Sequence, residues 1–134
     1  MILMHAYSRG QDFVAEKVTL DDAFEFLHAQ STEAEYDENF IGFTSEDDDK
    51  AMVQFIRHTN QDWTVDIPTF TDPNREYTGA LNCKITKDLV HALTRDFFDY
   101  TNTFYNDIVK RDYDNVIEYC KVRYGIVFDL EVSD

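Results

Sequence analysis

The sequence contains few of the residues that interrupt or cross-link a polypeptide chain. Among its 134 residues there are only four glycines, two prolines and two cysteines. The glycines are far apart, so the chain has no glycine-rich loop of the kind that holds a nucleotide phosphate. The two cysteines, Cys83 and Cys120, are too few for a disulfide scaffold. Both fall within apolar periodic patterns, which predicts reduced thiols in the core of a cytoplasmic protein.

Long apolar runs are also absent. No stretch approaches the roughly 18–20 apolar residues that a membrane-spanning helix requires. The chain starts with apolar residues between Met1 and His5, but these lack the basic residues and the long apolar segment of a signal peptide. We therefore expect a cytoplasmic protein that has no membrane partner.

The usual sequence signatures of catalysis and metal binding are missing as well. The four histidines, His5, His28, His58 and His91, are spread along the chain, and neither an HExxH nor a CxxC spacing occurs. A catalytic cysteine needs an electropositive environment that lowers the pKa of its thiol, and this chain is electronegative. We therefore expect no enzymatic activity, no metal and no cofactor.

Acidic residues are what the sequence has in abundance. Asp and Glu number 27 against 12 Lys and Arg, which gives a formal net charge of −15. The window from Ser31 to Lys50 holds eight of these acids and one lysine, so it alone carries −7. A concentrated field of this sign repels nucleic acid phosphates and attracts basic proteins at a distance. The sequence therefore predicts a basic protein partner and no direct binding of nucleic acid.

This window contains two acidic segments, one before Phe40 and one after Phe43. The predicted partner-binding residues are Glu33, Glu35, Tyr36, Asp37 and Glu38 in the first segment, and Glu46, Asp47, Asp48 and Asp49 in the second. Tyr36 is the best candidate for an aromatic anchor, because aromatic side chains supply contact area where carboxylates supply steering. The second segment has three interpretations: a solvated turn that protects strand edges, a partner-binding patch, or a metal site without the ligand spacing of a calcium loop.

Hydrophobic periodicity predicts most of the strands. Apolar and polar residues alternate with period two over 63–67 and 77–85, as in half-buried strands, and Trp63, Val65 and Ile67 are expected in the core. Strand 51–57 is apolar on both sides except for Gln54, which predicts a central strand covered on both faces. Pro68 is expected to begin the next connection. The full set of predicted strands is 2–8, 12–18, 40–43, 51–57, 63–67 and 77–85, with a terminal edge strand over 126–132.

Apolar residues at helical spacing predict three helices. The first begins after Thr19, and the second runs from Thr86 to Tyr100. The third spans 103–123, either unbroken or interrupted near Asp112, with Gly125 at its end. The stretch 31–39 is expected to be a loop or a frayed extension of the first helix. Because strands precede helices without βαβ alternation, the sequence predicts a single α+β domain over 1–134. Its sheet is an antiparallel meander, and its helices pack on one face.

The order of these elements resembles a known class of small proteins. A threonine-capped helix is followed by the strands that contain Asn39–Phe43, Val53–Phe55 and Trp63–Asp66, and then by the helix that ends near Tyr100. This order over residues 19–100, together with the acidity and with Gln54 on a central strand, is similar to bacterial immunity proteins of polymorphic and contact-dependent toxin systems. The resemblance implies a non-enzymatic protein that neutralises or regulates a basic partner, such as a toxin or a nuclease.

Two alternatives use the same acidity differently. An enzyme could employ carboxylates in a groove, which would require a deep pocket with perturbed acids. The charge could instead be an adaptation to the environment, because Asp outnumbers Glu 18 to 9, as in proteins adapted to high salt. The six lysines and the large apolar content oppose extreme salt adaptation.

Overall fold

The structure of this protein is a computed structural model that describes residues 2–8, 11–32, 39–46, 52–59, 61–70, 77–99 and 113–128. These residues form an antiparallel sheet of six strands and three helices, which confirms the predicted α+β class. The strands are β1 (Ile2–Ser8), β2 (Gln11–Val18), β3 (Asn39–Ser45), β4 (Met52–Arg57), β5 (Trp63–Phe70) and β6 (Tyr77–Ile85). The helices are α1 (Leu20–Thr32), α2 (Lys87–Phe98) and α4 (Tyr113–Tyr124).

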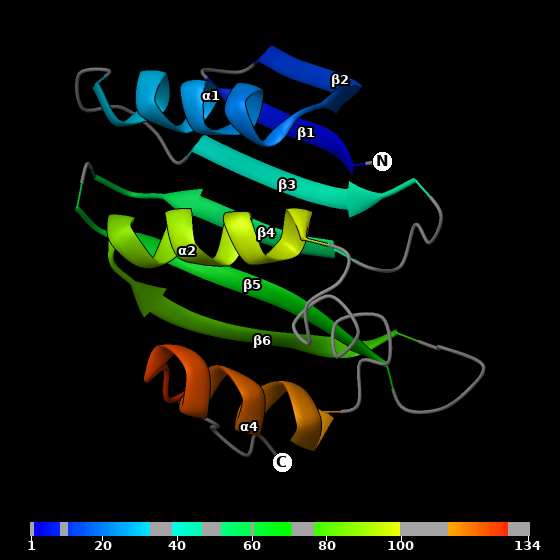
Figure 1. The fold of residues 1–134 in the computed structure, drawn as a ribbon, viewed down its shortest axis with the longest axis vertical. Coiled ribbons are helices and arrows are strands. Elements are labelled where there is room, and N and C mark those ends of the chain that lie inside the picture. The colour runs from blue at the N-terminus through cyan, green and yellow to red at the C-terminus, as the bar shows by residue number, and fades with distance from the viewer. Residues whose placement is uncertain are drawn as a thin grey trace.

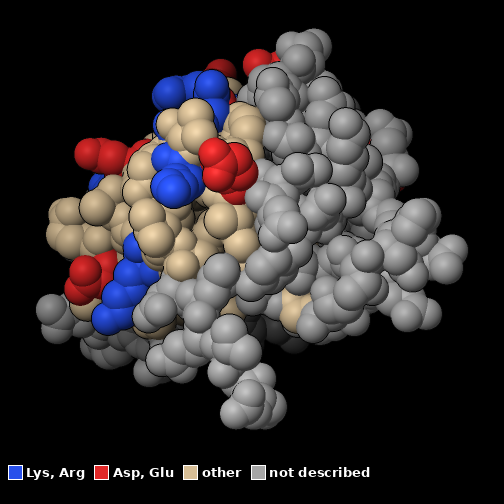
Figure 2. All heavy atoms as spheres, turned by 90° about the horizontal axis from the view of Figure 1, so that it is seen from below, with Lys and Arg blue, Asp and Glu red and all other residues tan. Residues whose placement is uncertain are grey.

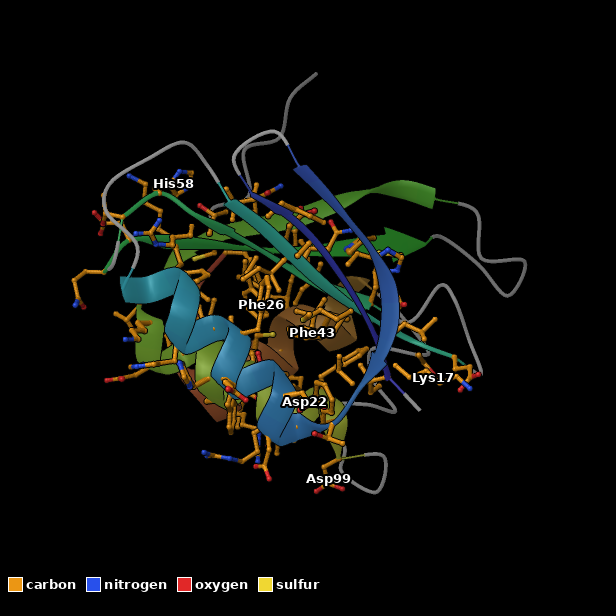
Figure 3. The ribbon with its side chains drawn as sticks, turned by 90° about the horizontal axis from the view of Figure 1, so that it is seen from above. Lys17, Asp22, Phe26, Phe43, His58 and Asp99 are labelled. Atoms are coloured by element: carbon orange, nitrogen blue, oxygen red, sulfur yellow. The ribbon has the colours of Figure 1, made fainter. Side chains whose placement is uncertain are left out.

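The sheet has the strand order β2-β1-β3-β4-β5-β6. From β3 onwards each strand pairs with the next one in sequence, so this part is the predicted meander. The first two strands form a hairpin, and β1 rather than β2 pairs with β3. Helix α1 makes the crossing between β2 and β3 (Figure 1). Figure 3 shows α1 and α2 on the same side of the sheet, as predicted for helices packed on one face.

The core lies between the sheet and these helices. One face of the sheet presents apolar side chains from every second residue, and on the central strands they are fully buried: Ile41, Phe43, Val53, Phe55, Trp63, Val65 and Ile67. Helix α2 contributes Val90, Leu93 and Phe97 from its apolar side, and α1 contributes Ala23 and Leu27. The prediction that Trp63, Val65 and Ile67 face the core is confirmed.

Strand β4 corrects one expectation. Its burial alternates strictly, with Val53, Phe55 and Arg57 buried and Met52, Gln54 and Ile56 only half-buried, so it is covered on one face and not on both. Arg57 carries a charge, yet it is only 1% exposed and lies on the same side of β4 as the buried Val53 and Phe55. Charged side chains are almost never buried to this degree unless they are paired.

Strand β5 corrects a second expectation, because it continues through Pro68 to Phe70. Its pairing with β4 covers Trp63–Asp66, whereas its pairing with β6 extends to Phe70, so Pro68 lies where β5 has only one paired neighbour. A proline is tolerated at such a position because its missing N–H costs no ladder hydrogen bond on the unpaired side.

The predicted helix starts are confirmed at their caps. The Thr19 hydroxyl accepts a hydrogen bond from the Asp22 amide at 3.1 Å, and the Thr19 amide donates to the Asp22 carboxylate at 3.2 Å. This reciprocal pair is a capping box. The Thr86 hydroxyl caps α2 by accepting a hydrogen bond from the Leu89 amide at 3.3 Å, and Leu89 has no side-chain acceptor to complete a box. Helix α1 continues to Thr32, so the stretch 31–39 begins as helix and enters β3 at Asn39.

The C-terminal part of the structure agrees only partly with the elements predicted from the sequence. Helix α4 begins at Tyr113, within the predicted span 103–123, and ends before Gly125, whose φ of 70° is the left-handed conformation that glycine adopts at helix ends. Residues 126–128 form no strand, which contradicts the predicted terminal strand for these three residues, although Ile126 and Phe128 are buried and Val127 is exposed. The remainder of that prediction, and residues 103–112, lie outside the described residues. Within the described ranges, no helix is long and apolar enough to span a membrane.

Candidate interaction surface

One of the predicted partner-binding residues lies within the described part of the chain. Glu33, Glu35, Tyr36, Asp37, Glu38, Asp47, Asp48 and Asp49 lie outside the described residues, and only Glu46 lies within them. Glu46 directly follows β3 and is exposed. Its carboxylate forms an ion pair with the Lys17 ammonium of β2 at 2.9 Å. Both side chains are solvated, so this pair contributes little to stability.

Further acids lie at the same end of the molecule as Glu46. Asp21 and Asp22 occupy the first turn of α1, where they complement the positive end of the helix dipole, and Asp99 follows the last residue of α2. Figure 3 shows Lys17, Asp22 and Asp99 on one side of the molecule and His58 on the opposite side. The tertiary structure therefore gathers described acids from α1, β3 and α2 at one end, which we call the acidic end and define by Asp21, Asp22, Glu46 and Asp99.

Strand β3 separates the two acidic segments of the sequence. It begins at Asn39, next to the first segment, and ends at Ser45, next to the second. A strand rises about 3.3 Å per residue, so the two ends of this seven-residue strand are roughly 20 Å apart. Glu46 of the second segment belongs to the acidic end, whereas the first segment precedes Asn39 at the opposite end of β3.

The face of the sheet that points away from α1 and α2 presents a different kind of surface. Cross-strand pairing aligns one residue from each of five strands in a row across its centre: His5, Gly42, Gln54, Asp66 and Asn82. The rows on either side contribute half-buried apolar side chains, namely Leu3, Phe40, Met52 and Ile56. None of the described helices packs on this side (Figure 3). We call this surface the open face.

Asp66 lies on the open face one strand in from the β6 edge of the sheet. It is directly opposite Gln54 on β4 and Asn82 on β6, and its side chain is half-buried. Burial raises the pKa of the Asp66 carboxyl, and no charged group of the described chain opposes that shift. A carboxylate desolvated without a compensating cation is unfavourable. In the sequence Asp66 belongs only to the polar side of the alternating strand 63–67, because its position opposite Gln54 depends on strand register.

Asp66→Thr is expected to stabilise the protein by about 1 kcal/mol, because threonine suits a central strand better than aspartate and carries no charge to desolvate. Urea unfolding at neutral pH would measure the gain. The folded protein raises the pKa of this carboxyl. The loss of stability caused by its ionised form is therefore fully present above the folded pKa and disappears below the unfolded value near 3.8. The difference between variant and wild type should therefore shrink as the pH falls, and a loss of stability at neutral pH would contradict the expectation.

Other charged groups are engaged inside the fold. The Asp96 carboxylate of α2 accepts hydrogen bonds from Arg123 Nε at 2.7 Å and Nη2 at 3.2 Å, and also from the Tyr124 hydroxyl. Burial acts to raise the pKa of Asp96, but the hydrogen bonds from Arg123 and Tyr124 outweigh it, so the pKa is lowered overall. Burial and the nearby Asp96 raise the pKa of Tyr124. This cluster joins α2 to α4 and is accounted for by that structural role.

The histidines do not converge. His91 of α2 stacks on Phe24 of α1 with ring centroids 5.1 Å apart, and His58 is hydrogen-bonded to the Thr64 hydroxyl at 2.8 Å. His5 is exposed on the open face, and His28 is exposed on α1. Among the described residues, no group of three histidine, cysteine or acidic side chains is placed to hold a metal ion.

The side of the molecule that carries α4 contrasts with the acidic end. Figure 2 looks at it from below, and its described part shows Lys and Arg interspersed with Asp and Glu. Helix α4 itself contributes Lys121 and Arg123 in its last turn. Both cysteines belong to this side of the fold and are not joined in a disulfide. Cys120 is buried, and Cys83 is half-buried with its thiol 3.5 Å from the Val127 carbonyl oxygen.

No protein-family model matches the chain, and no curated protein or solved structure matches it significantly. Inferences about function therefore rest on the charge, burial and geometry of the chain itself.

Proposed function

We propose that this protein is a non-enzymatic binding protein that neutralises or regulates a basic protein, as immunity proteins of toxin systems do. The observation that carries the proposal is the segregation of charge. The window from Ser31 to Lys50 holds −7 of the net −15, whereas residues 86–125 carry six Lys and Arg against seven acids. Such an arrangement orients an approaching cationic protein as well as attracting it.

The acidic end supports this proposal. Its members Asp21, Glu46 and Asp99 are exposed, and the second acidic segment continues directly from Glu46. Lys17 is the basic residue paired there, at 2.9 Å from Glu46, so the described acids outnumber it. Exposed charges act mainly through long-range attraction, and their effect on the association rate falls as salt screens them.

The two acidic segments have different proposed roles. The segment Glu33–Glu38 contains Tyr36, which we propose as an anchor at the contact itself. The segment Glu46–Asp49 contributes to the long-range field. Steering changes the association rate, whereas a buried aromatic anchor changes the dissociation rate.

An unbiased selection tests whether the partner is basic. Peptides would be selected from a random display library on the immobilised full-length protein, and we expect the recovered sequences to be enriched in Lys and Arg. A synthetic peptide from this pool would then serve as the probe for stopped-flow association. Recovery of peptides without basic enrichment would contradict the proposal.

Neutralising Glu33, Glu35, Asp37 and Glu38 to their amides is expected to slow association several-fold and to flatten its salt dependence. The matched control removes four acids from the near-neutral region, at Asp88, Asp107, Asp114 and Glu118. If local charge steers the partner, only the first variant should show the large effect. Tyr36→Ala should act on dissociation, by about 1 kcal/mol or more. An association rate that does not change with ionic strength or in either charge variant would show that the acidity plays no part in binding.

A further inference from the structure

The open face has a feature that the acidic end lacks, which is a carboxylate partly removed from water. Asp66 is half-buried on β5, whereas the acids of the acidic end are solvated on helix ends and a turn. Burial raises the pKa of Asp66, and none of the described hydrogen-bonding or charged groups compensates it. Exposed Lys84 lies on the same face, opposite Thr64 and therefore diagonal to Asp66. The pKa of Asp66 is raised despite this nearby ammonium.

The neighbours of Asp66 are suited to a planar cation. Gln54 and Asn82 stand directly opposite Asp66 on the two adjacent strands, where cross-strand side chains approach to about 5 Å. Their amide carbonyl oxygens can accept hydrogen bonds from the same group that pairs with the carboxylate. A guanidinium offers five N–H donors in one plane and is more weakly hydrated than an ammonium, so it suits a half-buried acid flanked by amides.

The rows beside this polar row are apolar on β3 and β4, whereas on β5 and β6 they include Thr64 and Lys84. Ile56 and Met52 lie two residues to either side of Gln54 on β4, and both are half-buried. On β3 the Phe40 ring lies over Gly42, since a Cβ atom added to Gly42 would meet Phe40 Cζ at 3.2 Å. A half-buried charge with apolar side chains along one side is a setting in which an arginine of a partner becomes a binding hot spot.

We propose that the open face is the surface that binds the basic partner, with an arginine of the partner paired to Asp66. This arginine lies between Gln54 and Asn82, and apolar side chains of the partner pack on Met52 and Ile56. This inference rests on the proposed function and adds a second step to the binding of the basic partner. The acidic segments speed the encounter, and the open face sets how long the complex lasts, because a desolvated pair acts mainly on dissociation.

Nuclear magnetic resonance titration of the ¹⁵N-labelled full-length protein tests this inference without a known partner. The probe is N-acetyl-arginine amide, and its matched control is N-acetyl-citrulline amide, which has nearly the same shape but no charge. Both are added at constant ionic strength. We expect the side-chain amides of Gln54 and Asn82 and the backbone amides around Asp66 to shift with the arginine probe and not with the citrulline probe.

Two variants give the inference its specificity. Asp66→Asn removes the charge but keeps the shape, and it should weaken the arginine probe about tenfold or more at the open face, since a charge-assisted pair becomes a neutral contact. Glu25→Gln removes an equal charge from an exposed position on α1 and should leave the titration unchanged. The dispersion of the Asp66→Asn spectrum verifies that the variant is folded, and removing a desolvated charge should not destabilise it.

Several outcomes would overturn the inference. Equal shifts with both probes, or shifts that survive in Asp66→Asn, would show that no cation site exists on this face. Shifts of the same residues upon dilution of the protein alone would assign the face to a second copy of this chain. Arginine-specific shifts confined to the acidic end would also overturn the inference, yet they would leave the proposed function standing, because that proposal is decided by the association rates.

Discussion

Replacing Trp63 with alanine is expected to lower the free energy of unfolding by about 3–5 kcal/mol, the usual range for removing a large aromatic side chain from a core. Trp63 is 1% exposed at the start of β5, opposite Ile85 of β6 and Arg57 of β4. The indole therefore fills space that alanine would leave as a cavity. Urea unfolding followed by circular dichroism would measure the loss in the variant, which no longer contains any tryptophan.

The wild-type protein provides an independent check on the same residue. Trp63 is the only tryptophan, so intrinsic fluorescence reports on this side chain alone, and its emission maximum should be blue-shifted in the native state. Val122→Ala is a suitable control, because Val122 is 75% exposed and should change stability by less than about 0.5 kcal/mol. A native emission maximum typical of tryptophan in water would contradict the buried position.

Removing the Asp96 carboxylate is the second change with a large expected effect. Asp96→Ala should lower stability by about 2–3 kcal/mol, because hydrogen bonds to a charged group contribute more than neutral ones and Tyr124 would lose its acceptor. The ion pair with Arg123 is expected to add little to this value, since half of the Arg123 side chain is exposed to solvent. Because the cluster joins α4 to α2, amide hydrogen exchange should increase more in α4 than in the central strand β4.

The effect of Asp96 should depend on pH in a defined direction. The folded state lowers the pKa of this carboxyl below 3.8, so its contribution is fully present above the unfolded value. It is then lost as the pH falls through the lower folded pKa. Wild type and Asp96→Ala should therefore differ at neutral pH and converge in strong acid. Glu118→Gln, an exposed acid on α4, should show no comparable difference, and a constant gap at every pH would argue against the ion pair.

The positions of the secondary-structure elements could largely be predicted, because their signals are local. Period-two alternation over Tyr77–Ile85 and the caps at Thr19 and Thr86 fix strands and helix starts within a few residues. The errors arose where the deciding contact is not local. Pro68 remains in a strand because β6 alone pairs with β5 there, and no property of the residues next to it in sequence shows this.

The candidate site divides in the same way. Net charge and its concentration between Ser31 and Lys50 follow from the sequence alone, because charges add regardless of fold. The open face does not, because apolar residues on both sides of β4 predict burial on both faces. Only the packing of α1 and α2 on one side leaves Met52 and Ile56 half-buried on the other.

The sequence by itself determined the fold class, most of the strand and helix positions, and the concentration of acidic charge between Ser31 and Lys50. The tertiary structure decided which residues become neighbours. It placed Asp66 between Gln54 and Asn82, joined Asp96 to Arg123 across 27 positions, and buried Arg57 in the core. The physical reason is that periodicity and charge are properties of nearby residues or of simple sums. Desolvation, by contrast, depends on which surfaces the folded chain brings together.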